Sequence, residues 1–274
     1  MLGEPLEATA VTPAGVLGDR GWAVRDEVRG GIRGAKKISK LMGLRAAYLR
    51  PPTAHDPNPP ISITLPDGTV TDSEAGDVNE LVSAALDHQV TLWPLQPATD
   101  LDHYRRGAAD SDDFLQEMRA IFGREVDEPL PDLTGFPPEI FEYESPLGTY
   151  VDAFPLLIMT TTSMRSLQAL LPDSQIDVRR FRPNLLVDID AEQSDDDPWP
   201  EMAWIGRQVA VGDAVFEIVM GCPRCVMITL PVEELPSDRA IMRTVVREAD
   251  QNLGVYATVV EPGTVRVGDR MRLL

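Results

Sequence analysis

Two cysteines, Cys222 and Cys225, lie three positions apart and are the only thiols in the 274-residue chain. A thiolate is a soft ligand and a good nucleophile, so a pair at this spacing can bind a soft metal, cycle between thiol and disulfide, or pack in a core. A structural zinc site needs four ligands, and the sequence offers neither a third cysteine nor a histidine near the pair. The pair therefore disfavours structural zinc.

Apolar runs stand on both sides of the cysteine pair, at 214–220 and 226–229, and both are typical of strands. A redox Cys-X-X-Cys pair belongs at a helix N-terminus in a βαβ unit, so strand-like flanks disfavour that role. One thiolate that ligates a soft transition metal, with the other ligands supplied by a cofactor, fits the cysteine count best. Two buried structural thiols are the alternative.

Three arginines, Arg179, Arg180 and Arg182, precede an apolar strand expected at 184–188. A guanidinium fork binds phosphate and other oxyanions through two hydrogen bonds at once. The chain has a net charge of −19, so a local concentration of positive charge needs a reason. Two interpretations stay open: an oxyanion site, and a basic edge that pairs with nearby carboxylates.

A run of hydroxyl side chains at 160–163 follows a buried strand expected at 149–159 and precedes a short helix expected at 164–171. Hydroxyls in this position cap helices, and they also offer donors where anions bind favourably. Nearer the N-terminus, Arg20 lies in a turn before a strand, where a surface ion pair explains it as well as a ligand does. The basic, glycine-rich loop at 30–37 is a weak anion-site signal of the same kind.

The remaining chemistry is limited by composition. The three histidines, His55, His88 and His103, have no acid–base partner in sequence and are expected in surface positions or turns, which disfavours a hydrolase triad. With 44 acidic against 25 basic side chains, nucleic-acid binding is not expected. No apolar run is long enough to span a bilayer and the N-terminus lacks a secretory signal, so we expect a cytoplasmic protein without membrane contact.

The patterns predict a mainly β fold with a few helices, of the α+β class. Residues 1–96 are expected to form a β-rich domain with a hairpin at 61–72 and one helix at 77–86. Residues 97–147 are acidic and rich in proline, and we expect a connecting insertion with a helix at 114–122. Residues 148–274 form the second expected domain, with its longest helix at 238–252.

Five motifs occur in one order: Gly-Asp-Arg-x-Trp at 18–22, Phe-Pro-Leu-Leu at 154–157, Arg-Phe-Arg-Pro-Asn at 180–184, Cys-Pro-Arg-Cys at 222–225 and Gly-Thr-Val-Arg-Val-Gly-Asp at 263–269. In this order the chain resembles MOSC-domain proteins, the relatives of the molybdenum cofactor sulfurase C-terminal domain and of the mitochondrial amidoxime-reducing component. The resemblance covers nearly the whole chain. The third and fourth motifs together make it specific.

The resemblance implies an N-terminal β-barrel-like domain followed by a MOSC β-barrel domain, with the molybdenum cofactor, molybdopterin, between them. It implies that Cys225 is the catalytic residue and supplies the thiolate to molybdenum. It also implies a set of cofactor-binding residues, namely Arg20, Arg180, Arg182, Asn184, Thr160, Thr161 and Arg224. For Thr160 and Thr161 the correspondence with the family is loose.

The resemblance further implies an oxidoreductase that reduces N-oxygenated small molecules with electrons from an external donor protein. The alternatives are a non-catalytic carrier of the cofactor or of sulfur, and a degenerate MOSC protein without cofactor. Pyridoxal phosphate is associated with the superfamily, but only Lys36, Lys37 and Lys40 could form a Schiff base here, so we do not expect it. Family members start with a Tyr-Pro-Val-Lys-Ser strand, and a chain starting at Met1 lacks it; we expect either a misplaced start or weak or absent cofactor binding.

Overall fold

The computed structural model of this chain describes residues 2–189 and 197–274. The chain divides into two compact units. Unit 1 comprises Met1–Glu4, Gly18–Ile121 and Leu133–Ala153, and unit 2 comprises Pro5–Leu17, Phe122–Asp132 and Phe154–Leu274. The chain therefore crosses between the units several times, whereas the predicted division at 96 and 147 is sequential. That division stays a prediction about domains.

Unit 1 contains two three-stranded antiparallel sheets, with strand orders β4-β3-β8 and β5-β6-β7. Its elements are β3 (Trp22–Asp26), β4 (Ile32–Arg33), η1 (Ser39–Gly43), β5 (Arg45–Tyr48), β6 (Ile61–Thr64), β7 (Val70–Asp72), α1 (Val78–Leu86), β8 (Val90–Pro94), α2 (Leu101–Tyr104), α3 (Phe114–Phe122) and η2 (Pro138–Phe141). The predicted hairpin is confirmed as β6–β7, where Gly68 takes a φ of +88° and Asp67 accepts from the Thr69 N–H at 2.9 Å.

Part of the core of unit 1 comes from the proline-rich segment after β8. Tyr104 is 0% exposed and His103 only 4%, and the His103 and Tyr104 rings meet edge to face with centroids 5.2 Å apart. His103 Nε2 lies 2.7 Å from the Tyr150 hydroxyl, and burial lowers the pKa of His103. The expectation that His103 lies at the surface is therefore wrong. A polar, proline-rich neighbourhood concealed an aromatic cluster formed by distant residues.

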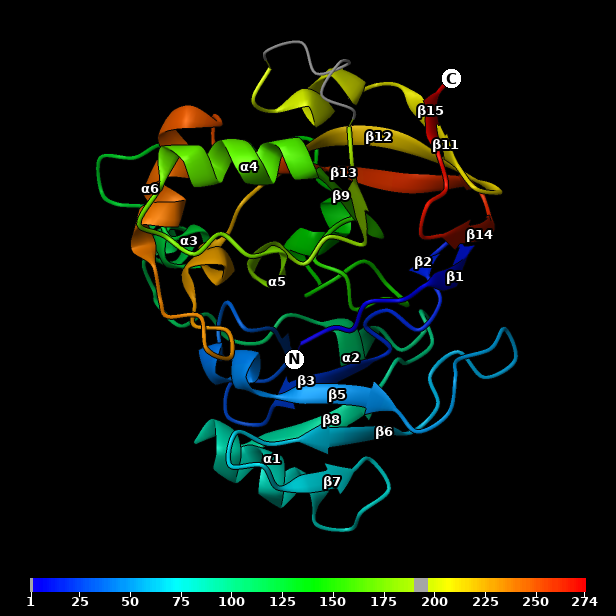
Figure 1. Cartoon of the computed structure of the whole chain (residues 1–274). Coiled ribbons are helices and arrows are strands. Elements are labelled where there is room, and N and C mark those ends of the chain that lie inside the picture. The colour runs from blue at the N-terminus through cyan, green and yellow to red at the C-terminus, as the bar shows by residue number, and fades with distance from the viewer. Residues whose placement is uncertain (1, 190–196) are drawn as a thin grey trace. The chain divides into compact units, whose positions relative to one another are not determined.

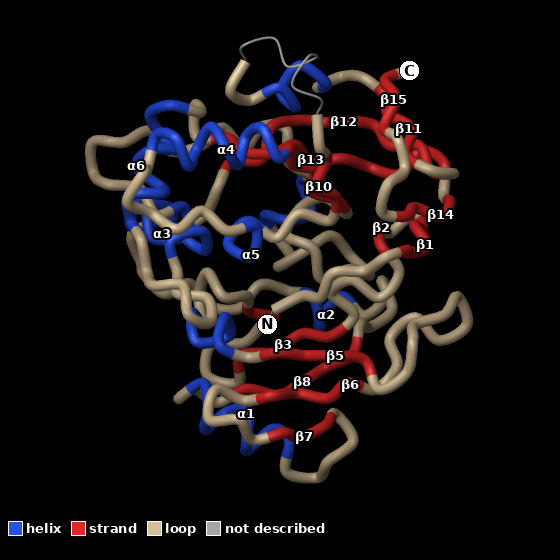
Figure 2. The backbone as a smooth tube through the Cα atoms, in the orientation of Figure 1, coloured by secondary structure: helices blue, strands red, loops and turns tan. Residues whose placement is uncertain are grey.

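Unit 2 is built on a six-stranded sheet of order β10-β9-β13-β12-β11-β15, which curls into half a barrel (Figure 1). Only the β9–β10 pair is parallel, and a small sheet of order β14-β1-β2 lies in the same unit (Figure 2). The elements are β1 (Ala8–Thr12), β2 (Gly15–Val16), β9 (Leu156–Thr160), α4 (Thr161–Leu170), α5 (Val178–Phe181), β10 (Leu185–Val187), η3 (Pro200–Trp204), β11 (Gln208–Val211), β12 (Ala214–Pro223), η4 (Val226–Thr229), α6 (Arg239–Glu248), β13 (Asn252–Glu261), β14 (Gly263–Arg266) and β15 (Met271–Leu273). The strand-rich α+β fold is confirmed.

Each face of the six-stranded sheet is covered by a hydrophobic cluster. Side chains alternate between the faces of a strand, so Ile158 and Met159 of β9 belong to different clusters. The cluster that contains Met159 also takes Phe181, Ile228 and residues of α4 and α6. Two of the predicted motifs are thus anchored in one core, because Phe181 precedes Arg182 and Ile228 follows Cys225 by three positions.

Three local predictions are wrong in their limits or type. The strand expected at 149–159 begins only at Leu156, since the chain before it turns, with the Ser145 hydroxyl donating to the Thr149 carbonyl at 2.7 Å. The run at 226–229 is the 3-10 helix η4 rather than a strand. The helix α6 ends at Glu248, because Asp250 and Gln251 adopt the left-handed φ values of 44° and 68°.

Within residues 2–189 and 197–274, no helix combines the length and the apolar character that a membrane span requires.

Candidate functional site

The strand β12 delivers the two cysteines to different surroundings. Its pairing with β13 shifts register between Ile218 and Met220 and again between Gly221 and Pro223, and such bulges bend a strand near its end. Cys222, inside the strand, is 3% exposed. Cys225 lies beyond the strand, at the N-cap of η4, and is half-buried. The two cysteines are therefore not equivalent, although they lie close in sequence. Cys222 is part of the core, and Cys225 is partly exposed to solvent.

Arg224, which lies between the cysteines, joins the Cys-Pro-Arg-Cys motif to the Arg-Phe-Arg-Pro-Asn motif. Its guanidinium donates from Nη2 to the Phe181 carbonyl at 2.8 Å, and from Nη1 to the Leu253 carbonyl and to Cys222 Sγ, both at 3.3 Å. It also lies over the Phe181 ring, 5.5 Å from the centroid. One side chain, 7% exposed, thus fixes the cysteine loop against the Arg-Phe-Arg-Pro-Asn segment.

The thiol of Cys222 is held in its neutral form. Burial raises its pKa, and this effect outweighs the opposing charge of Arg224. A thiol that stays protonated is a poor metal ligand and a poor nucleophile. The surroundings of Cys222 therefore suit a side chain that packs in the core rather than one that binds a metal.

The Arg-Phe-Arg-Pro-Asn segment places its polar residues in three different ways. Arg180 is 1% exposed, and its guanidinium donates to three carbonyls, those of Gln175 at 3.1 Å, Leu230 at 2.9 Å and Pro236 at 2.7 Å. Such a side chain supports the fold, and its role toward a cofactor stays a prediction.

Arg182 and Asn184 follow in the same segment. Arg182 is half-buried and takes the left-handed conformation, with φ 56° and ψ 49°, at the end of α5. The following Pro183 disfavours a right-handed helical Arg182, and non-glycine residues in this region are typical of functional sites. Asn184 exchanges two hydrogen bonds with the backbone of Leu157, accepting at 2.9 Å and donating at 2.8 Å. Asn184 therefore holds this segment beside β9.

The hydroxyl run confirms the capping interpretation. Thr160 is 0% exposed, and its hydroxyl oxygen accepts from the Ser163 N–H at 3.0 Å as the N-cap of α4. The hydroxyls of Thr160 and Ser163 donate to Glu201, which is also 0% exposed, at 2.8 and 2.5 Å. Burial raises the pKa of Glu201. Thr161 is half-buried and donates to Asp188.

Arg20 lies in unit 1, whereas the other predicted site residues lie in unit 2. Its Nη1 is 3.0 Å from an Asp152 carboxylate oxygen, and Lys36 Nζ is 2.6 Å from the other oxygen. Burial alone would raise the pKa of Asp152. The positive charges of Lys36 and Arg20, with Lys36 the stronger of the two, outweigh burial and hold this pKa well below its usual range. Arg20 also has a left-handed φ of 51°. The sequence indicated Arg20 and Lys36 separately, but not that they share a carboxylate.

Sequence reasoning missed Arg124, which lies in the acidic segment but folds into unit 2. Its side chain is 6% exposed, and the pKa of Arg124 is lowered to about 10, chiefly by burial; the nearby charges of Glu128 and Cys225 oppose this. Nothing in the local pattern marks it, because its partners Gln251 and Met242 are more than a hundred positions away. Only the presence of an arginine within a strongly acidic stretch could have drawn attention to it.

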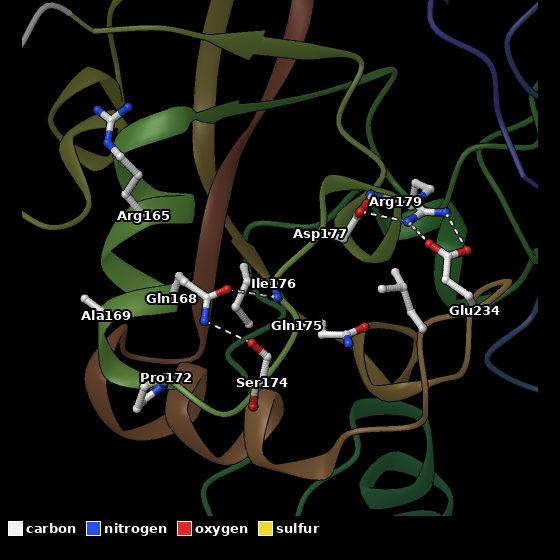
Figure 3. A pocket seen from close by; sticks show the side chains of 11 residues that line it. Arg165, Gln168, Ala169, Pro172, Ser174, Gln175, Ile176, Asp177, Arg179 and Glu234 are labelled. Carbon is white, nitrogen blue, oxygen red and sulfur yellow. Dashed lines mark hydrogen bonds and ion pairs between the residues drawn. The ribbon is translucent and has the colours of Figure 1, made fainter.

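A second region, a hollow of about 890 Å³, opens beside α4 and α5 in unit 2 (Figure 3). Its main cation, Arg179, donates to both oxygens of Asp177 at 2.9 Å and to Glu234 at 2.7 Å. On the other wall, Gln168 donates to the Ser174 carbonyl at 2.9 Å and so closes the turn after α4. The charges that line the hollow are therefore already paired within the fold.

In the parts of the chain that the structure describes, no three histidine, cysteine or acidic side chains group in a way that could hold a metal ion.

Part of this chain is similar to known proteins. Residues 148–272 match the MOSC domain. Mitochondrial amidoxime-reducing component 1 is 29% identical over 138 residues in both Mus musculus and Homo sapiens, covering 46% of this chain and 38% of those proteins. Mitochondrial amidoxime reducing component 2 of Macaca fascicularis is 28% identical, covering 44% and 37%. The matched part of this chain thus spans less than two fifths of these relatives.

Solved structures give a weaker likeness. The YuaD protein of Bacillus subtilis is 15% identical, with a TM-score of 0.35, over 46% of this chain and 68% of that one. YiiM of Geobacillus stearothermophilus is also 15% identical, with a TM-score of 0.32, over 44% and 54%.

Proposed function

We propose that this chain, which matches the MOSC domain over residues 148–272 and is distantly similar to the mitochondrial amidoxime-reducing components, binds the molybdenum cofactor and reduces N-hydroxylated small molecules. Reduction of an N–OH group to N–H takes two electrons and two protons and releases water. The electrons would come from a separate donor protein. The names of the relatives supply the substrate class, since they are called amidoxime-reducing.

One observation carries the proposal: Arg224 ties Phe181 to the cysteine loop, so that the segments that carry Arg182 and Cys225 are anchored in one buried core. The donor set fits the cofactor, because a thiolate suits a soft transition metal and arginine suits a phosphate. Close by, Nη2 of Arg124 is a buried donor without a hydrogen-bond partner among the described residues, as expected where an anionic group binds.

We assign Cys225 as the metal ligand and Arg182 as a residue that holds the anionic part of the cofactor. When bound, molybdenum would supply the two-electron chemistry. Arg224, Arg180 and Asn184 would act through the fold, by fixing the loop and the segment that carry those two residues. Cys222 would be a packing thiol. Arg20, Thr160 and Thr161 stay sequence-based predictions.

The test compares two single-cysteine variants with the wild type, all produced in a host that makes the cofactor. Cys225→Ala should lower the molybdenum content at least tenfold, by analogy with the effect of about 10- to 100-fold known for mutations around metal ligands, while Cys222→Ala keeps most of it. Oxidation of a reduced dye by an amidoxime or hydroxylamine should be lost in parallel. Wild-type protein without molybdenum would contradict the proposal, and molybdenum without dye oxidation would favour a carrier.

A further inference from the structure

We infer that Arg124 is a second recognition residue of the Cys225 site, and that its guanidinium holds an acceptor oxygen of an anionic ligand bound there. The inference rests on the proposed function in one respect, because it takes Cys225 as the centre of the site. It does not depend on which metal or which substrate that site takes.

The backbone of residue 123 packs directly on the residue that follows Cys225. Gly123 has a left-handed φ of +61°, and a Cβ added to it would lie 3.3 Å from Val226 Cα. Arg243 donates to the Gly123 carbonyl and fixes the turn. The left-handed φ and the close approach together favour glycine at this position, and the approach brings Arg124 near the cysteine loop.

The side chain of Arg124 is held firmly but incompletely. Its Nε donates to Gln251 Oε1 at 3.2 Å, and its Nη1 donates to the Phe122 carbonyl at 2.5 Å and faces the Met242 sulfur at 2.8 Å. Its Nη2 is buried and has no hydrogen-bond partner among the described residues. An unsatisfied buried donor destabilises a fold, and an acceptor oxygen supplied by a ligand would remove that cost.

Arg124 is charged and lies among other ionisable groups. Burial lowers the pKa of Arg124 to about 10, so the group stays charged at neutral pH. The charge of Arg243 adds to this lowering of the pKa of Arg124, whereas the charges of Glu128 and Cys225 oppose it. Cys225 is therefore close enough to Arg124 to interact with it electrostatically. The pairing of Arg243 with Glu128 balances one positive charge in this cluster. The Nη2 of Arg124 thus remains a charged donor without an acceptor among the described residues.

Arg124 differs in this from Arg224, the other buried arginine beside the cysteines. Arg224 directs both of its terminal nitrogens to groups of the protein, namely two carbonyls and the Cys222 thiol. The two side chains have the same type and nearly the same burial, at 6% and 7% exposed. A purely structural arginine in this region therefore uses both terminal nitrogens, and Arg124 does not.

The experiment measures alkylation of Cys225 in the cofactor-free, full-length protein. Iodoacetate and iodoacetamide differ in charge but little in size, and mass spectrometry of the Cys225 peptide gives both rates. Arg124→Met should lower the iodoacetate-to-iodoacetamide rate ratio roughly fivefold, the effect of one unit charge at about 4 Å in water. Arg124→Lys should keep most of the ratio. Arg239→Met removes an exposed charge from the same unit and should change it less than about twofold.

A ratio that Arg124→Met leaves at the wild-type value would overturn the inference, even if both rates fall together, since an equal loss reports the access or the ionisation of the thiol rather than recognition of an anion. If Arg124→Met does not fold, Arg124→Gln replaces it, because this change keeps a hydrogen-bond donor but removes the charge. Its ratio should fall to a similar extent, and a ratio equal to that of the wild type would overturn the inference. Molybdenum content plays no part in this test. The alkylation test can therefore fail while the proposed function stands, and the proposed function can fail while the alkylation test succeeds.

Discussion

The hollow beside α4 and α5 and the loop that carries Cys225 both contain arginines, but their guanidinium groups end on different partners. In the hollow, Arg179 is bound by the carboxylates of Asp177, Glu233 and Glu234. In the cysteine loop, Arg224 donates to backbone carbonyls and a thiol. A carboxylate cancels the charge of an arginine, whereas a carbonyl satisfies its hydrogen bonds and leaves the charge in place.

This difference separates a basic edge from an anion site, the two interpretations that the sequence left open for the arginine cluster. Arg179 follows the first interpretation, although Arg180 and Arg182 lie within three positions of it. In the cysteine loop, the hydrogen bonds of Arg224 end on carbonyls and a thiol, so they do not cancel its charge. A volume of about 890 Å³ in the hollow is therefore a poorer guide to function here than the partners of the arginines.

The largest expected effect is on stability, for Arg224→Met. The change leaves the buried carbonyls of Phe181 and Leu253 without their donor, and we expect a loss of about 3–5 kcal/mol in the free energy of unfolding. Urea denaturation measures it, with Arg239→Met as a control that should stay within about 0.5 kcal/mol. A loss below about 1 kcal/mol would show that Arg224 is not the link between the two motifs.

The two thiols should differ in the same assay. Cys222 is 3% exposed, so Cys222→Ala leaves a small cavity and should cost about 1–2 kcal/mol in the free energy of unfolding. Cys225→Ala, at a half-buried position, should cost less than about 0.5 kcal/mol in the cofactor-free protein. Equal losses would remove the distinction between a packing thiol and a reachable one.

The hydroxyl run can be tested through Glu201. Its pKa is raised in the folded protein, so the folded state binds the proton more tightly than the unfolded chain, and this group's contribution to stability falls as the pH rises from the ordinary carboxyl range to the raised value. Glu201→Gln accepts the same hydroxyl hydrogen bonds without a charge. The free energy of unfolding of Glu201→Gln should therefore exceed that of the wild type by more at pH 8 than at pH 4. Parallel pH profiles would mean that Glu201 is not buried as described.

The smallest expected effect is for Arg179→Met. Its ion pairs with Asp177 and Glu234 are exposed to water and salt, so the unfolding midpoint should hardly change, and the small change should shrink further in 1 M NaCl. Its iodoacetate-to-iodoacetamide ratio at Cys225 should equal that of the wild type. A change in that ratio as large as that of Arg124→Met would end the contrast between the two regions.

The sequence was a good guide where the structure is decided locally. Alternating apolar residues located β6 and the hairpin, and periodic ones located α1 and α3. It failed where the backbone conformation differs from what the composition indicates. The turn before Leu156 and the end of α6 depend on backbone conformation, and the 3-10 helix after Cys225 replaces a run whose composition is equally typical of a strand.

At the site, the residue types were visible but their exposure was not. Arg180, Arg182 and Arg224 look alike in sequence, yet two are buried on carbonyls and one is half-buried in a left-handed turn. Arg124 gave no local signal at all. Exposure and hydrogen-bond partners are properties of the folded chain, set by contacts such as that between Gly123 and Val226, which lie about a hundred positions apart.

The three bonds of Arg224 also bear on how the site can be studied. They join residues near positions 181, 222 and 253, so the loop gains its shape only after chain segments far apart in sequence have met. Contacts of this kind form late and cooperatively during folding. A synthetic peptide containing Cys-Pro-Arg-Cys would therefore lack the carbonyls that orient it, and its affinity for a metal would say little about Cys225 in the protein.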